Sequence, residues 1–153
     1  MDYLRNGEDQ LVNEHRFIST IKEYYEGCNT RNETLMKSTF TDDVIHYFVD
    51  HPAVSSADGL ANYWCKVGPA THATWSVDHA IVQEPEAVIE WSMLWKPLTK
   101  DSFEVLRGTE WFVFRDDKIA EIRSYHCNFY LNDPQNRSLH EFDYVGRGYL
   151  PEA

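Results

Sequence analysis

The segment that most constrains the fold spans residues 107–130 and reads RGTEWFVFRDDKIAEIRSYHCNFY. Two long runs rich in Trp, Phe, Ile and Tyr, which are typical of β-strands, flank a short polar turn at Asp116 and Asp117. Because a strand twists along its length, strands of about ten residues curve the sheet that contains them. The hairpin therefore predicts a strongly curved sheet with a hollow side, and what fills that hollow is the functional question.

Composition and charge narrow the class of protein. A chain of 153 residues is normally one domain, and a hydrophobic content of 42% with 14% aromatic residues is enough for a buried core. The net charge of -11 and the isoelectric point near 4.9 argue against nucleic acid, an anionic membrane surface and a strongly anionic substrate as partners. No apolar run approaches the ~18 residues of a spanning helix, and residues 1–10 are too polar for a signal peptide.

The three cysteines, Cys28, Cys65 and Cys127, are odd in number and widely spaced. Such a set is typical of reduced thiols and not of a disulfide framework. It predicts a cytoplasmic protein.

An amphipathic helix of about five turns is predicted near the N-terminus, and it should end at Asn29 or Thr30. Its apolar face contains Leu11, Ile18, Ile21, Tyr25 and Cys28. The other predicted elements are a helix over residues 33–38, a strand over 44–49, a helix that begins at Ser56 or Asp58 and ends at Gly68, and strands over 72–84, 87–95, 103–115 and 118–130. Three helices followed by an antiparallel meander of four strands, with one early strand added, make an α+β fold with the helices on one sheet face.

No internal repeat or linker divides the chain, so the sequence predicts a single domain over residues 1–153 with a core over about 10–130. The segment 131–153 still carries apolar residues such as Leu139 and Phe142. We expect it to pack on the domain, and it could cover the pocket or a partner chain.

The order of elements and the phrases FTDDVIHYF and RGTEWFVFRDDKIAEIRSY resemble the SnoaL-like polyketide cyclase family. That family belongs to the superfamily named after nuclear transport factor two, which also includes ketosteroid isomerase and several dehydratases. The resemblance covers about residues 13–129. It implies a cone-shaped curved antiparallel sheet of about five strands, packed against three N-terminal helices, with an apolar pocket and usually a homodimer. It does not fix the reaction, because the fold hosts many chemistries and some proteins that only bind.

The catalytic residues of these relatives are only partly present. Dehydratases of the superfamily pair an Asp at the end of the first helix with a His entering the first long strand, and these positions correspond here to Asn29 and His72. An Asn can orient an imidazole by a hydrogen bond, but it cannot stabilise the imidazolium with a charge. A cyclase-type acid late in the last strand would fall at residues 125–128, which contain no carboxylate.

Three histidines are candidates for proton transfer. His46 faces the pocket if Val44, His46 and Phe48 share the inner face of their strand, and the alternative is a buried His that only makes structural hydrogen bonds. His72 has the positional match, and His126 lies where the last strand reaches the open end of the cone. Tyr25 and Asn29 would orient an imidazole or donate to an oxygen. The predicted pocket walls are Phe48, Trp64, Trp91, Met93, Trp111 and Tyr125.

Two acidic residues, Glu90 and Glu110, interrupt apolar strands. On the inner face either carboxylate would be desolvated and suited to act as a base. On the outer face they would pair with Arg107 or Arg123 in neighbouring strands, and this interpretation is favoured because both Arg residues lie in these strands. The histidines at 46, 51, 72 and 79, with Asp50 or Asp78, have no known metal-ligand spacing, so neither a metal nor another cofactor is predicted.

The sequence therefore predicts a cone that binds a small apolar molecule, cyclic or carbonyl-containing. The expected activity is cofactor-free isomerisation, cyclisation or dehydration, in which His72 or His46 moves the proton. The alternative is a non-catalytic ligand-binding or accessory protein that forms a homodimer.

Overall fold

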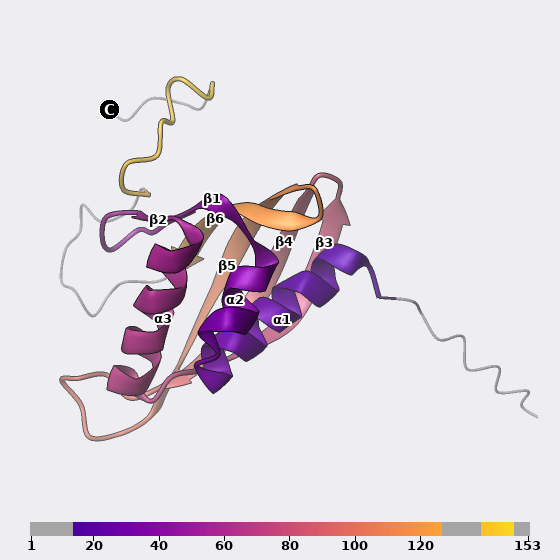
Figure 1. Cartoon of the computed structure of the whole chain (residues 1–153). Helices are drawn as coiled ribbons and strands as arrows, with labels where there is room; N and C mark the ends of the chain where they lie inside the picture. Colours follow the sequence, from indigo (N-terminus) through magenta and orange to yellow (C-terminus); the bar gives the residue numbers. More distant parts are fainter. Residues whose placement is uncertain (1–13, 127–138, 149–153) are drawn as a thin grey trace, which may run out of the picture.

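The fold is seen in a computed structural model that describes residues 14–126 and 139–148. It confirms the α+β fold, with helices and strands in the predicted order (Figure 1). The elements are α1 (Arg16–Thr30), α2 (Glu33–Thr39), β1 (Phe40–Tyr47), β2 (Val54–Ser55), α3 (Ala57–Thr71), β3 (Thr74–Gln83), β4 (Glu86–Trp95), β5 (Glu104–Arg115) and β6 (Lys118–His126). The strands form one curved, unclosed sheet in the order β2-β1-β6-β5-β4-β3.

The predicted meander of four antiparallel strands is confirmed for β3 to β6. The pairing of β1 with β6 is parallel, however, so the sheet is not antiparallel throughout. Arg115 pairs with Lys118 across the hairpin, which leaves a two-residue turn. Its residues Asp116 and Asp117 have φ angles of 51° and 62°. These left-handed conformations match the right-handed twist of the flanking strands, which is why such turns favour small polar residues or glycine.

One helix end agrees with the prediction and one differs. Helix α1 ends at Thr30, as predicted, and the residue that follows it in the left-handed conformation is Arg31, at φ 58°. Helix α3 continues through Gly68 and Pro69 to Thr71, and His72 then takes a left-handed conformation at φ 51°. The long strand β3 consequently begins at Thr74, and His72 is a helix cap instead of a strand residue. Leu11 of the predicted apolar face lies outside the described residues.

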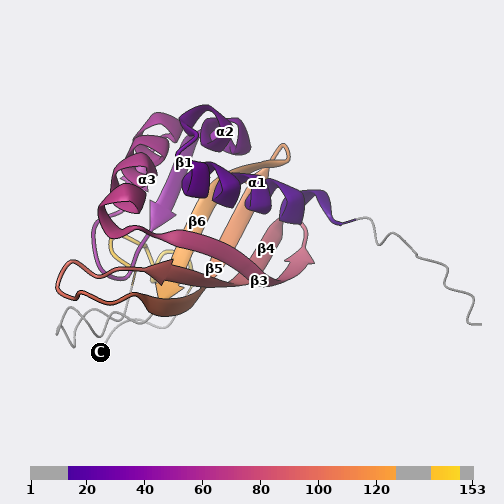
Figure 2. The same ribbon diagram turned by 90° about the horizontal axis from the view of Figure 1, so that it is seen from below.

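The three helices lie on the concave face of the sheet, with α1 crossing its strands (Figure 2). Aromatic side chains join the two layers: Phe17 stacks on Phe114 at 3.8 Å between ring centroids, and Tyr24 packs edge-on against Phe40 and Phe112. Phe17, Ile21 and Tyr24 recur at helical spacing and are buried, as expected for one face of an amphipathic helix. None of the described helices is long and apolar enough to cross a membrane.

Residues 139–148 pack on the convex face of the sheet. Leu139 and Phe142 are buried against Tyr47 and Val49 of the β1 region. The ring of Phe142 lies 5.0 Å from the guanidinium of Arg123 and 4.3 Å from that of Arg147. The expectation that the tail packs on the domain is thus met by this segment, on the face opposite the helices. The rest of the predicted tail, 131–138 and 149–153, lies outside the described residues.

Candidate active site

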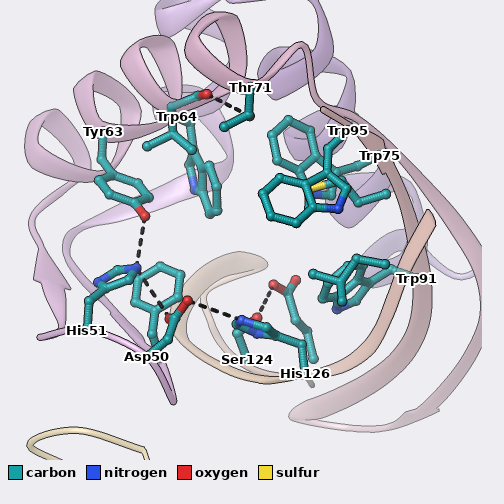
Figure 3. Close-up of a pocket in the computed structure, with 15 residues that line it drawn as sticks. Asp50, His51, Tyr63, Trp64, Thr71, Trp75, Trp91, Trp95, Ser124 and His126 are labelled. Atoms are coloured by element: carbon teal, nitrogen blue, oxygen red, sulfur yellow. Dashed lines mark hydrogen bonds and ion pairs between the residues drawn. The ribbon is translucent and has the colours of Figure 1, made fainter. Parts of the chain in front are cut away.

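A cavity of about 120 Å³ lies between α3 and the concave face of the sheet (Figure 3). Aromatic side chains form most of its wall: Phe48, Tyr63, Trp64, Trp75, Trp91 and Trp95. Val67, Met93 and Leu106 complete the apolar part, and the polar part consists of Asp50, His51, Thr71, Glu110, Ser124 and His126. Of the predicted wall residues, Phe48, Trp64, Trp91 and Met93 line this cavity.

Strand register sets the order of the cavity residues. Trp91, Gly108 and His126 lie in one row across β4, β5 and β6, and Ile89, Glu110 and Ser124 lie in another. A Cβ atom on Gly108 would lie 2.5 Å from Cζ2 of Trp91, so only glycine lets the indole lie flat on β5. A glycine inside a strand pattern is the sequence signal that could have located this close approach.

Glu110 is the buried acid of the cavity, with 5% of its surface exposed. The hydroxyl of Tyr25 donates to its Oε2 at 2.8 Å, and the hydroxyl of Ser124 donates to its Oε1 at 2.7 Å. Burial raises the pKa of Glu110, while the hydrogen bonds from Ser124 and Tyr25 act in the opposite direction. The favoured prediction that Glu110 pairs with Arg on the outer face is wrong.

The physical reason is strand alternation. Glu110 shares its face with Leu106, Phe112 and Phe114, which are buried, whereas Arg107 is exposed on the opposite face. Arg123 also lies on the convex face, where it donates to Glu121 at 2.6 Å. Glu90, the other acid considered, is exposed on the outer face of β4, the face that the favoured interpretation gave it.

His46 lies beside Glu110 and is fully buried on the inner face of β1, as predicted, but it does not line the cavity. Its ring stacks on Phe48 at 3.9 Å, and its Nε2 is 3.6 Å from Oε1 of Glu110, too far for a hydrogen bond. Neither ring nitrogen has a hydrogen-bond partner within the part of the chain that the structure describes. Burial lowers the pKa of His46 well below 6.5, and repulsion from His51 and His126 adds to this, so the ring is neutral.

The other titratable side chains gather around Asp50. Its Oδ2 is 3.3 Å from Nε2 of His126, and its Oδ1 is 3.7 Å from Nε2 of His51. Nδ1 of His51 lies 2.8 Å from the carbonyl oxygen of Pro52, which can only accept, so this nitrogen carries the proton. Nε2 then accepts from the hydroxyl of Tyr63 at 2.8 Å. Burial raises the pKa of Tyr63, and the charge of Asp50 adds to the shift.

Sequence reasoning missed Asp50 and His51 as cavity residues, and considered them only as metal ligands. Their signal is position, since they directly follow the strand predicted over 44–49, on whose inner face His46 and Phe48 were expected. Within residues 14–126 and 139–148, no group of three His, Cys, Asp or Glu side chains is arranged to hold a metal ion.

Of the five predicted catalytic residues, His126 is the one that lines the cavity. Tyr25 and His46 are buried next to Glu110 without lining the cavity, and Asn29 and His72 lie elsewhere. Asn29 forms two hydrogen bonds with the backbone of Trp75, both at 2.8 Å. Its amide nitrogen donates to the carbonyl oxygen of Trp75, and its Oδ1 accepts from the N–H of Trp75. Its side chain is therefore occupied in positioning a cavity wall and orients no imidazole. His72, the helix cap, is exposed, and its ring lies 6.3 Å from that of Phe103.

Two predicted wall residues also lie elsewhere. Trp111 is 39% exposed on the convex face, and its indole donates to Glu86 at 2.9 Å. Tyr125 packs with Tyr47 and Phe142 on the same convex face. Side chains alternate between the two faces of β5 and β6, and at this end of the hairpin the even-numbered residues point inward. Trp111 and Tyr125 are odd-numbered and so point outward; the sequence did not show which of the two faces is the inner one.

Cys28 and Cys65 are free thiols, in line with the expectation of reduced cysteines. Burial raises the pKa of Cys28 well above its usual value, which disfavours the reactive thiolate. Cys127 lies outside the described residues.

Comparison with known families and structures identifies relatives of this fold. The family model of the SnoaL-like domain matches residues 21–122. A protein of unknown function with a cystatin-like fold, from Methylobium petroleophilum PM1, is 29% identical with a TM-score of 0.75, and the match covers 90% of this chain and 93% of that one. No curated protein sequence matches this chain.

Two further solved structures share the fold at low identity. A protein described as a SnoaL-like polyketide cyclase, from Jannaschia sp. CCS1, is 12% identical with a TM-score of 0.66 over 82% of this chain and 95% of that one. A protein described as a ketosteroid isomerase, from Kribbella flavida DSM 17836, is 11% identical with a TM-score of 0.63 over 74% and 78%. At such identities the likeness establishes the fold alone.

Proposed function

Because this chain belongs to the SnoaL-like domain family, whose fold forms a ligand-binding cone, we propose that it catalyses proton transfer on a small, largely apolar molecule bound in the cavity. The substrate class is a carbonyl compound, and the reaction is isomerisation, cyclisation or dehydration without a cofactor. The observation that carries the proposal is the meeting of Glu110 and His126 in one aromatic cavity. Two separate proton-transfer groups facing one bound molecule are what such reactions require.

Glu110 is proposed as the general base. Its carboxylate removes a proton from the carbon next to the carbonyl group, and the electron pair of the broken C–H bond moves into an enolate. Burial favours this step, because a carboxylate with a raised pKa is a stronger base than one in water. Tyr25 and Ser124 are positioning residues that hold its two oxygens.

His126 is proposed as the general acid, with Asp50 as its positioning residue. The imidazolium returns a proton to a second position of the enolate, which completes an isomerisation, or to a departing hydroxyl, which completes a dehydration. The Asp50 carboxylate, whose Oδ2 lies 3.3 Å from Nε2 of His126, fixes the orientation of the ring. Exchange of protons with water then resets Glu110 and His126 for the next turnover.

A non-catalytic receptor is the second candidate, and one observation favours it. Both oxygens of Glu110 already accept hydroxyl hydrogen bonds, so the carboxylate can serve as a purely structural centre. A receptor binds ligands in the same cavity without moving a proton.

Deuterium exchange separates these two functions without knowledge of the natural substrate. The protein is expected to accelerate exchange of the hydrogens next to the carbonyl of cyclohexanone in D₂O, followed by proton NMR. Replacing His126 with Gln should lower the exchange rate by about 10²-fold, since the variant lacks the group that returns a deuteron. The matched control is His79→Gln, which changes an exposed histidine of β3. Exchange no faster than in buffer would establish the receptor instead.

A homodimer is proposed as the assembly. Ile81, Val88 and Trp111 lie in register on the convex face of β3, β4 and β5, and Ile81 and Trp111 are 58% and 39% exposed. Such an exposed apolar row is typical of an interaction surface. A cytoplasmic location remains a prediction from the cysteine count.

Sedimentation velocity tests the dimer. The unchanged chain is expected to sediment as a dimer that dissociates on dilution, and Ile81→Arg should sediment as a monomer because it buries an unpaired charge in the interface. Leu98→Arg is the control, since Leu98 is 82% exposed in the loop after β4. A sedimentation coefficient of the single chain that does not change with dilution would refute the dimer.

A further inference from the structure

We infer that the ligand of this cavity carries an alkylammonium group, which the aromatic side chains surround and the carboxylates of Glu110 and Asp50 balance in charge. The inference names the substrate class of the proposed function, and it rests on that function only for the location of the bound molecule.

The aromatic side chains approach the cavity from several elements, as Figure 3 shows for Tyr63, Trp64, Trp75, Trp91 and Trp95. Three of these rings are in contact: Tyr63 and Trp64 are 4.9 Å apart between centroids, and Trp64 and Trp75 are 5.4 Å apart in an edge-on arrangement. An alkylated cation binds to the negative face of an aromatic ring, most strongly to Trp, and cages of several rings are the usual way in which proteins bind such cations. Four of the five tryptophans of the chain line this one cavity.

The charged groups of the cavity also favour a cation. Of the described lining residues, two are carboxylates and none is Lys or Arg. Glu110 is buried with two neutral hydroxyls as its hydrogen-bond donors, and the neighbouring His46 is neutral. Apart from the charge of His126, no cation of the described residues acts on Glu110, and a buried carboxylate without a close positive partner is costly. A cationic ligand would supply that close positive charge. The net charge of -11 would attract such a ligand from solution.

The size of the cavity fits the head of such a molecule. An apolar cavity of about 150 Å³ holds benzene, and this one has about 120 Å³. A trimethylammonium head is more compact than a benzene ring, so it fills the space between the tryptophans. The rest of the ligand can leave past Asp50 and His51, whose side chains are 15% and 29% exposed.

The test compares choline with 3,3-dimethylbutan-1-ol, its neutral analogue, in which carbon replaces the quaternary nitrogen. Isothermal titration calorimetry is expected to show that choline binds about tenfold or more tightly than the alcohol. Glu110→Gln and Trp91→Leu should each remove most of this preference, and Trp91→Phe, which keeps a ring, should retain part of it. Trp111→Phe changes a tryptophan on the convex face and should leave both affinities unchanged.

Equal affinities for the two compounds, tighter binding of the alcohol, or no binding of choline would each overturn the inference. Choline has no carbonyl group, so its binding does not depend on proton transfer. Choline binding without deuterium exchange of ketones would refute the proposed function and leave the inference standing. Deuterium exchange of ketones without a preference for choline over the alcohol would support the proposed function and refute the inference.

Discussion

Replacing Glu110 with Gln is expected to lower the rate of deuterium exchange into cyclohexanone by about 10²- to 10⁴-fold, the contribution typical of a general base. Gln has the shape of Glu, but its amide cannot accept a proton from carbon at neutral pH. The fold should persist, because the amide oxygen can still accept from Ser124 and the amide nitrogen can donate to Tyr25. Exchange is measured by proton NMR at equal protein concentrations.

The matched control is Glu90→Gln, which removes the same charge from the exposed face of β4 and should leave the exchange rate unchanged. This pair of variants separates the local effect of the base from the effect of total charge. If Glu110→Gln exchanges as fast as the unchanged chain, Glu110 is not the base. If both variants slow exchange equally, the effect arises from net charge.

The parts of the fold that depend on neighbouring residues could be predicted from the sequence. Alternation of Val44, His46 and Phe48 placed His46 on the inner face, and the aromatic hairpin predicted a curved sheet. In both cases the pattern repeats every two residues, and a single buried face fixes it. The same alternation applied to Leu106, Glu110 and Phe112 would have oriented Glu110 inward. The prediction instead placed Glu110 on the outer face, because an ion pair with Arg has a lower free-energy cost than burial of a carboxylate.

The site itself depends on contacts between distant residues. Tyr25 meets Glu110 across 85 positions, and His126 meets Asp50 across 76. The second contact follows from the parallel pairing of β1 with β6, for which no short-range pattern exists. The predicted position of His72 is wrong for a local reason, since helix α3 continues past Gly68 and Pro69. That extension makes His72 a cap and moves it away from the strand that was expected to carry it.

The second large effect concerns stability and involves the adjacent pair His46 and Glu110. Burial lowers the pKa of His46 well below 6.5 and raises that of Glu110 above 4.5. At a pH above 4.5 that is below both 6.5 and the folded-state pKa of Glu110, the native pair therefore holds one proton, on Glu110. The unfolded chain also holds one, on His46. Because both states bind the same number of protons, the pair contributes no pH dependence to stability in this window.

Each single variant removes one of the two proton-binding groups, so the pH dependence of stability due to the other group should become measurable. In Glu110→Gln, only the unfolded state binds a proton, at His46, so the free energy of unfolding should rise with pH by about 1.4 kcal/mol per pH unit relative to the unchanged chain. In His46→Phe, only Glu110 has a pKa that changes on folding, so the free energy of unfolding should fall as the pH rises from 4.5 towards the folded-state pKa of Glu110. The slopes are obtained from urea unfolding at several pH values between the ordinary pKa values of Glu and His, 4.5 and 6.5.

The double variant His46→Phe with Glu110→Gln gives the decisive comparison, because it lacks both groups and should recover the slope of the unchanged chain. Other titratable groups face this pair, namely Tyr24, Tyr25 and Cys28 from α1, His126 from β6, and Asp50 and His51 from the loop after β1. They are common to all four proteins, so their contributions cancel in the differences to first order. Parallel curves for the unchanged chain and both single variants would mean that neither group changes its pKa on folding. The buried carboxyl at the centre of the cavity would then lack the raised pKa that makes it a base.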